Sequence, residues 1–233
     1  MLTGSKQKEF METKSITWSF SSAKDFDNCP RKYNETRVLK RFKQGDTTAT
    51  LYGTAVHLAL EEFLRDGTPI PPQFAQFQKY ADPFVGIAGG MYLEHKIGVR
   101  EDFSPCDFMD KKVWWRGIPD LLVVKPNGVA LVGDWKTGKS ARYADTDQLE
   151  LLAAAVMQHF PEVHTVKGAL IFVVADAVVN AEYKRDRLPA IWSKWAGQVS
   201  RIEAAIEHDV WNATPNSLCG FCPVTTCPHN RSR

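Results

Sequence analysis

Two short apolar runs, joined by a turn and bounded on the outside by two aspartates, constrain the fold of this chain most strongly. The runs are 121–124 and 129–132, and the sequence Pro-Asn-Gly occupies 126–128 between them. An Asn-Gly between two β-type runs predicts an antiparallel hairpin. Counting outward from a three-residue loop then sets Asp120 directly across from Asp134.

Like charges directly opposite each other destabilise a sheet, so two carboxylates at this place require a reason. Because strand side chains alternate between faces, Lys136 projects on the same side as Asp134, and Trp135 points the other way. Two facing acids beside an ammonium group predict a divalent-cation site suited to phosphodiester hydrolysis. The alternative is an ordinary solvent-exposed hairpin rim, where acids and lysines are common.

Composition places the chain among ordinary globular proteins. Its 233 residues allow one large or two small domains, and the hydrophobic and charged fractions are 44% and 24%. No apolar run approaches the roughly 20 residues of a membrane span. Residues 1–14 are polar and include acids, so we expect neither a signal nor a transit peptide, and a cytoplasmic location. The net charge of +2 is too small to demonstrate a nucleic-acid partner. Basic residues gather between 31 and 43, where a solvated helical face is the simplest interpretation.

Periodicity along the chain predicts a mixed α/β fold, with helices flanking one sheet. We expect residues 1–15 to be a flexible tail and 16–233 to form a single domain. Helices are predicted from Ser22, over 48–65, 73–87, 145–159 and 188–208, and strands over 91–99, 112–116, 120–136 (the hairpin) and 166–174.

Four further residues are candidates for the site. Gly53 and His57 lie one turn apart on a predicted helix, where the glycine permits close approach and a neutral imidazole can bind a metal. A histidine that satisfies a buried hydrogen bond is the alternative. Gln148 opens the helix after Lys136, and Glu94 is an upstream strand acid of secondary interest. Tyr143 lies in the intervening loop, where a tyrosine either packs or stacks on a base.

The cysteines are unevenly distributed. Cys219, Cys222 and Cys227 form a C-x2-C-x4-C group, while Cys29 lies near the N-terminus and Cys106 stands alone. No secretory context supports disulfides, so this spacing predicts a metal site whose fourth ligand is most naturally Cys29. Prolines follow three of these cysteines, as occurs at iron–sulfur ligands. We expect Cys106 to be a buried or incidental thiol.

Pro119-Asp120 followed by Asp134-Trp135-Lys136 resembles the PD-(D/E)xK nuclease superfamily, in which these motifs lie on adjacent strands of a central sheet. The Gly-x-x-x-His pattern at 53–57 is similar to the first motif of its RecB-type branch. This resemblance implies that His57, Asp120 and Asp134 bind Mg²⁺ or Mn²⁺. It also implies catalytic roles for Asp120, Asp134, Lys136 and Gln148. The family's Gln-x-x-x-Tyr motif is incomplete, because Leu152 takes the place of the tyrosine.

One cysteine near one end and three near the other resemble the four-cysteine nucleases, namely the AddB-type and CRISPR-associated exonucleases. The resemblance implies a restriction-endonuclease-like mixed central sheet whose terminal segments are joined by a [4Fe-4S] cluster on Cys29, Cys219, Cys222 and Cys227. Structural zinc, bound by the same thiolates or with His229 replacing one, is the alternative.

The resemblance implies a divalent-metal-dependent DNA exonuclease that acts on single-stranded DNA or DNA ends. Recombination, repair, CRISPR adaptation and phage DNA metabolism all fit this activity. Recombination or CRISPR-adaptation proteins would be its partners, and it would associate with the nucleoid. Either a monomer or an oligomer is compatible with the resemblance. The alternative is a non-catalytic DNA-binding or assembly subunit, which loss of a site acid or the lysine would favour. All of them are present. We expect any helicase motor to be a separate protein.

Overall fold

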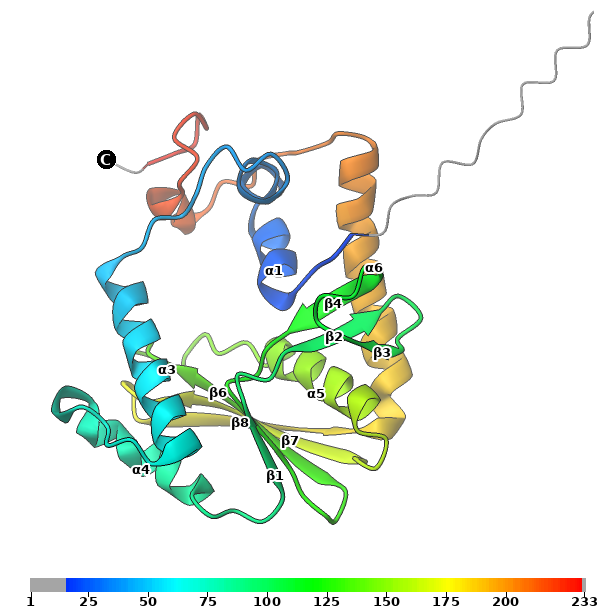
Figure 1. Ribbon diagram of the computed structural model, residues 1–233. Helices are drawn as coiled ribbons and strands as arrows, with labels where there is room; N and C mark the ends of the chain where they lie inside the picture. The colour runs from blue at the N-terminus through cyan, green and yellow to red at the C-terminus, as the bar shows by residue number, and fades with distance from the viewer. Residues whose placement is uncertain (1–15, 232–233) are drawn as a thin grey trace, which may run out of the picture.

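A five-stranded mixed sheet forms the centre of the computed structural model, which describes residues 16–231 (Figure 1). Its strand order is β1-β5-β6-β7-β8, with bounds Gly90–Leu93, Leu121–Val124, Val129–Lys136, Thr165–Phe172 and Ala177–Lys184. Strands β6 and β7 pair in parallel, and the other neighbours pair antiparallel. The predicted mixed α/β fold with a central mixed sheet and flanking helices is confirmed. The predicted tail at 1–15 lies outside the described residues.

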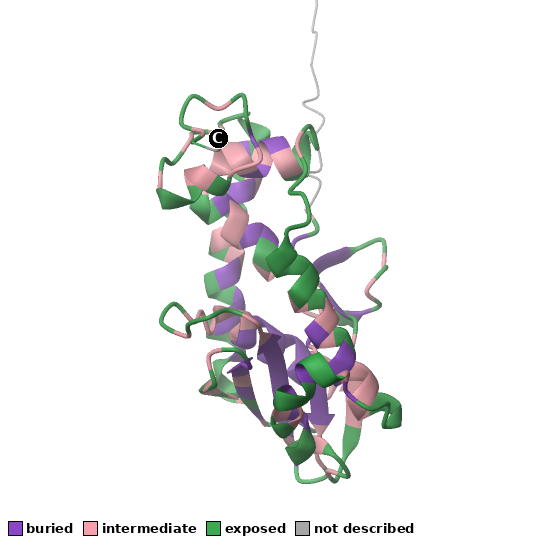
Figure 2. Ribbon diagram, turned by 90° about the vertical axis from the view of Figure 1, so that its left-hand side faces the viewer, coloured by how far each residue is buried: buried purple, intermediate pink, exposed green. Residues whose placement is uncertain are grey.

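Helices cover both faces of this sheet. Helix α5 (Asp147–His159) connects β6 to β7 and is buried along most of its length, as its nearly continuous apolar sequence requires. With α6 (Leu188–Glu207) it forms one hydrophobic core. On the other face, α3 (Thr48–Asp66) packs with short helices: η2 (Pro72–Phe77), α4 (Gln78–Ala81) and η3 (Asp82–Phe84). The buried strands lie between these layers (Figure 2). Within residues 16–231, no helix has both the length and the apolar character needed to cross a membrane.

The prediction of a single sheet was wrong. A second, three-stranded sheet of order β3-β2-β4 contains β2 (Ile97–Arg100), β3 (Pro105–Cys106) and β4 (Val113–Gly117). The strand predicted over 91–99 is therefore two strands in different sheets, separated at Glu94, which adopts a positive φ of 48°. Such a backbone turn leaves no signal in apolar patterning.

Further predictions along the chain also differ from the structure. The chain after 174 was expected to contain no strand before the last helix, yet β8 lies there as an edge strand that alternates half-buried with exposed residues. The helical region predicted over 73–87 consists of the three short pieces η2, α4 and η3, because Pro83 cannot continue a regular helix. Helices α3, α5 and α6 agree with their predictions to within two residues.

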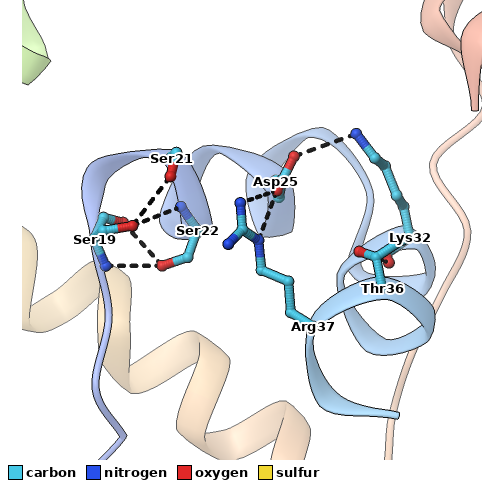
Figure 3. Close-up of polar contacts among 7 residues, drawn as sticks. All are labelled: Ser19, Ser21, Ser22, Asp25, Lys32, Thr36 and Arg37. Atoms are coloured by element: carbon cyan, nitrogen blue, oxygen red, sulfur yellow. Dashed lines mark hydrogen bonds and ion pairs between the residues drawn. The ribbon is translucent and has the colours of Figure 1, made fainter. Parts of the chain in front are cut away.

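The N-terminal helices and the C-terminal segment lie side by side, away from the sheet (Figure 1). They comprise α1 (Phe20–Asn28), α2 (Pro30–Tyr33), the π-helix η1 (Asn34–Val38) and η5 (Ser217–Phe221). The backbone N–H of Arg31 donates to Asn212 O at 3.3 Å, and Asn216 Nδ2 donates to Asn28 O at 3.1 Å. Helix α1 begins after Ser19 in a capping box with Ser22, and not at Ser22 as predicted (Figure 3).

Candidate active site

The β5–β6 hairpin has the register predicted from the sequence. Lys125 N–H donates to Val129 O at 2.9 Å, and pairing continues outward to Leu121 opposite Gly133. Asp120 directly precedes β5, so it lies beside the end of β6. There its Oδ2 accepts a hydrogen bond of 2.6 Å from the backbone N–H of Trp135. A backbone donor therefore orients the first carboxylate.

Asp134, Lys136 and Gln148 contact one another in a closed triangle. The Lys136 ammonium is ion-paired with Asp134 and also donates to Gln148 Oε1 at 2.9 Å. Gln148 Nε2 donates to Asp134 Oδ1 at 2.5 Å. The first turn of α5 supplies Gln148, and strand alternation directs Asp134 and Lys136 toward that helix, while Trp135 packs on the α3 side.

A second group of ligand-type side chains adjoins this triangle. His57 Nδ1 lies 3.4 Å from Asp120 Oδ2, and a ligand atom of each of His57, Glu94 and Asp120 lies within 4.8 Å of the others. Within residues 16–231 this is the one group of three or more His, Cys, Asp or Glu ligand atoms at that spacing. Asp134 lies outside it, and Glu94, of secondary interest in the sequence, lies inside. The break after β1 explains this, since Glu94 N–H donates to Asp120 O at 3.1 Å.

Sequence reasoning missed Glu61, which lines one cavity with His57, Glu94 and Asp120. It lies one helical turn after His57 on α3, so the i, i+4 spacing could have identified it.

The carboxylates of the site lie close together and are partly buried, which raises the pKa values of Asp134 and Glu94. Burial, assisted by the charge of Asp120, raises the pKa of Asp134 to about 6. Burial and then the charges of Asp120 and Glu61 raise the pKa of Glu94 to about 7. Burial lowers the pKa of His57, but its hydrogen bond to Asp120 and the nearby acids outweigh that effect and raise it overall. The site therefore concentrates negative charge that a cation would neutralise.

The donor set fits a divalent metal. Carboxylate oxygens suit Mg²⁺ and Mn²⁺, and an imidazole nitrogen favours a transition-type ion among these. The group of His57, Glu94 and Asp120 supplies both kinds of atom at close spacing.

The four cysteines predicted to bind metal line a single cavity of about 190 Å³ between the terminal segments. Backbone N–H groups already point at two thiols, from Thr214 to Cys29 at 3.5 Å and from Asn216 to Cys219 at 3.4 Å. No three of the thiols in the described chain lie within 4.8 Å of one another. A tetrahedral zinc site, with Zn–S distances of about 2.3 Å, holds its sulfurs closer, at about 3.8 Å.

The remaining predicted residues lie apart from both groups. Cys106 is buried on β3, and burial raises the pKa of its thiol. Tyr143 is 84% exposed in the loop before α5, with the Arg142 guanidinium carbon 5.5 Å from its ring centre. Leu152, at the position of the family's tyrosine, is buried in the core.

A sequence model of the PD-(D/E)XK nuclease superfamily matches residues 17–85 and 90–228, and the chain belongs to this superfamily. Among solved structures, a candidate exonuclease from Eubacterium rectale is similar over 100% of this chain and 95% of its own, with a TM-score of 0.53 and 15% identity. SSO0001 is similar over 92% and 87% of the two chains, with a TM-score of 0.49 and 15% identity. At 15% identity the likeness to the Eubacterium rectale protein concerns the fold. Among curated proteins, none matches this sequence.

Proposed function

We propose that this protein is a divalent-metal-dependent deoxyribonuclease of the RecB-like branch, acting as an exonuclease. The observation that carries the proposal is the meeting of two side-chain groups at the end of the β5–β6 hairpin. The triangle of Asp134, Lys136 and Gln148 adjoins the group of His57, Glu94 and Asp120. Membership of the nuclease superfamily supports the same reaction class.

His57, Asp120 and Asp134 would hold Mg²⁺ or Mn²⁺, with Glu94 as a further ligand. The bound cation would polarise a phosphoryl oxygen and make a water molecule more acidic. Asp120 is oriented for this task by the Trp135 backbone N–H. The high pKa values of Asp134 and Glu94 mean that protons compete with the cation, so metal binding strengthens as pH rises.

Lys136 would orient the attacking water and stabilise the negative charge that develops on the phosphate. Gln148 is a positioning residue in this proposal, because its side-chain oxygen accepts from Lys136 and its nitrogen donates to Asp134. Both groups are thereby held before substrate arrives, which lowers the reorganisation needed during the reaction.

DNA, as single strands or at ends, is the substrate that the four-cysteine resemblance suggests. Recombination, repair, CRISPR adaptation and phage DNA metabolism are the pathways in which such an enzyme would act, with partner proteins from those pathways. Tyr143 is exposed enough to stack on a base.

The four thiols would hold a [4Fe-4S] cluster that joins the terminal segments. Their shared cavity supports this. Anaerobically purified protein should then be brown, with an absorption band near ~400 nm from thiolate-to-iron charge transfer. Colourless protein with about one zinc per chain would show that the thiols bind zinc and not a cluster. Metal-free protein would show that they bind no metal.

The test of the activity uses end-labelled single- and double-stranded DNA, with Mg²⁺, Mn²⁺ or EDTA. We expect metal-dependent digestion by the wild type, and loss of digestion in Asp134→Ala and Lys136→Ala. Lys167→Ala, which removes an exposed lysine of the same sheet, is the matched control and should retain full activity. Circular single strands should outlast linear ones. Wild-type rates in either site variant would reject the assignment, and binding without cleavage by the wild type would favour a DNA-binding subunit.

A further inference from the structure

Arg116, on β4, is a cation without a partner. Its Nε is shielded from solvent but has no hydrogen-bond partner, and within residues 16–231 no carboxylate forms an ion pair with its guanidinium. The guanidinium carbon lies 5.1 Å from the ring centre of Phe108, which supports it from one side. Shielding part of a charged group without pairing it costs free energy, so this arrangement calls for an anion.

The position of Arg116 indicates which anion. It lines a cavity of about 510 Å³ together with Lys136 and Gln148. It also lines the adjoining cavity, together with Arg37 and Phe108. A chain molecule that passes through both spaces would therefore meet the proposed catalytic lysine and then Arg116.

The other charged groups around the first cavity are already paired. Asp25 of α1 contacts Lys32 at 3.3 Å and Arg37 at 2.6 Å, as Figure 3 shows, so its charge is largely neutralised. Lys24 pairs with Asp145 at 2.8 Å. Lys136 pairs with Asp134. Among these lining residues, Arg116 therefore holds the one charge without an ionic partner.

We propose that Arg116 binds a backbone phosphate of the nucleic-acid strand, next to the phosphate that is cleaved. A guanidinium can donate two parallel hydrogen bonds to phosphate oxygens, which gives both affinity and orientation. Only Gly117, Ile118 and Pro119 separate Arg116 from Asp120. A short segment therefore links the phosphate bound by Arg116 to the cleaved phosphate at the proposed metal site. This inference rests on the proposed function. It adds which phosphate of the nucleic-acid strand is held beside the cleaved one.

The test uses a series of single-stranded oligonucleotides, each with one neutral methylphosphonate in place of a phosphate. Binding is measured by fluorescence anisotropy in Ca²⁺, and cleavage in Mn²⁺. For the wild type, we expect one linkage near the cleaved one at which neutralisation weakens binding about tenfold, the loss expected for one charge-assisted contact. Arg116→Gln should bind unmodified DNA about tenfold more weakly and show no further loss at that linkage.

Arg187→Gln, which removes an exposed arginine directly before α6, is the control for net charge and should behave as wild type. Arg116→Lys should recover part of the affinity. Since no ion pair is lost, Arg116→Gln should keep the wild-type melting temperature; if it does not fold, Arg116→Lys and the wild-type scan decide the question.

Wild-type binding by Arg116→Gln, with an unchanged sensitive linkage, would overturn the inference while leaving the nuclease proposal intact. Conversely, a sensitive linkage that depends on Arg116, in a protein that does not cleave, would reject the nuclease proposal alone.

Discussion

At the scale of single residues, folding places Asp134 where ionisation is costly. Asp134 is 4% exposed, and the pKa of its carboxyl rises from an ordinary 3.8 to about 6. Between these values the folded protein keeps a proton that the unfolded chain has lost. Stability therefore falls as pH rises through this window and stays lower above it.

We predict that the EDTA-treated protein is more stable at pH 5 than at pH 8, and that Asp134→Asn reduces this difference by on the order of 2 kcal/mol. Urea unfolding at both pH values measures it. Asp186→Asn, at an exposed position, is the control and should leave the difference unchanged. A variant as pH-dependent as the wild type would show that Asp134 does not carry the effect.

Replacing Gln148 tests how much the positioning of Lys136 and Asp134 contributes to the cleavage rate. We predict that Gln148→Ala lowers the cleavage rate roughly 10- to 100-fold, the usual cost of losing a residue that orients a metal site, while folding is retained. Initial rates in Mn²⁺ measure this. Gln158→Ala, near the other end of α5, should cleave as the wild type. Equal rates in both variants would leave Gln148 without a role.

The sequence identifies those site residues whose relations are local. The hairpin register predicts that Asp120 lies beside Asp134, and strand alternation predicts the side on which Lys136 lies. Glu94 was named from the sequence only as a secondary candidate, and Arg116 was not named, because their places in the site are not local. One depends on a positive φ between two sheets, and the other on a strand whose neighbours are fixed by tertiary packing.

At the scale of elements, Gly117 at the end of β4 carries a steric constraint. A Cβ placed there would lie 2.2 Å from Trp115 Cη2, and Trp115 is itself fully buried. The strand therefore requires glycine where it turns toward Asp120.

We predict that Gly117→Ala destabilises the protein by about 1–3 kcal/mol, since a packed core resists added atoms. Urea or thermal unfolding measures this. Gly197→Ala is the matched control: its Cβ would meet nothing within 4 Å, and it lies within α6, where alanine is favoured over glycine by up to about 1 kcal/mol. If Gly117→Ala were as stable as Gly197→Ala, the constraint would be refuted.

Elements with strong periodicity were predicted well, and those without it were not. Helix α3 begins with a capping box at Thr47 and ends at Gly67, whose φ is +78°, so both ends are marked in the sequence. Strand β8 is half-buried at an edge and lacks an apolar face strong enough to distinguish it from a loop. Its place is set by pairing with β7.

At the scale of the whole molecule, the terminal segments meet around the four-cysteine cavity. We predict that Ala in place of Cys29, Cys219, Cys222 or Cys227 lowers stability by several kcal/mol, since a metal joining Cys29 to Cys219 would close a very long loop. Thermal unfolding of metal-loaded protein measures this.

Cys106→Ala is the control, and it should be nearly neutral because Cys106 lies on β3, away from that cavity. A Cys29 variant with unchanged stability and metal content would show that no metal joins the two segments.

The meeting of the two terminal segments also bears on the order in which the protein folds during translation. The segment beginning at Ala213 is translated after every residue of the proposed catalytic group, whereas Cys29 is translated before all of them. On the ribosome, the central sheet and its carboxylates can therefore assemble before the cysteines that complete the cavity around Cys29 have been translated. A nascent chain would then pass through a stage in which the proposed catalytic group is assembled before the terminal segments meet.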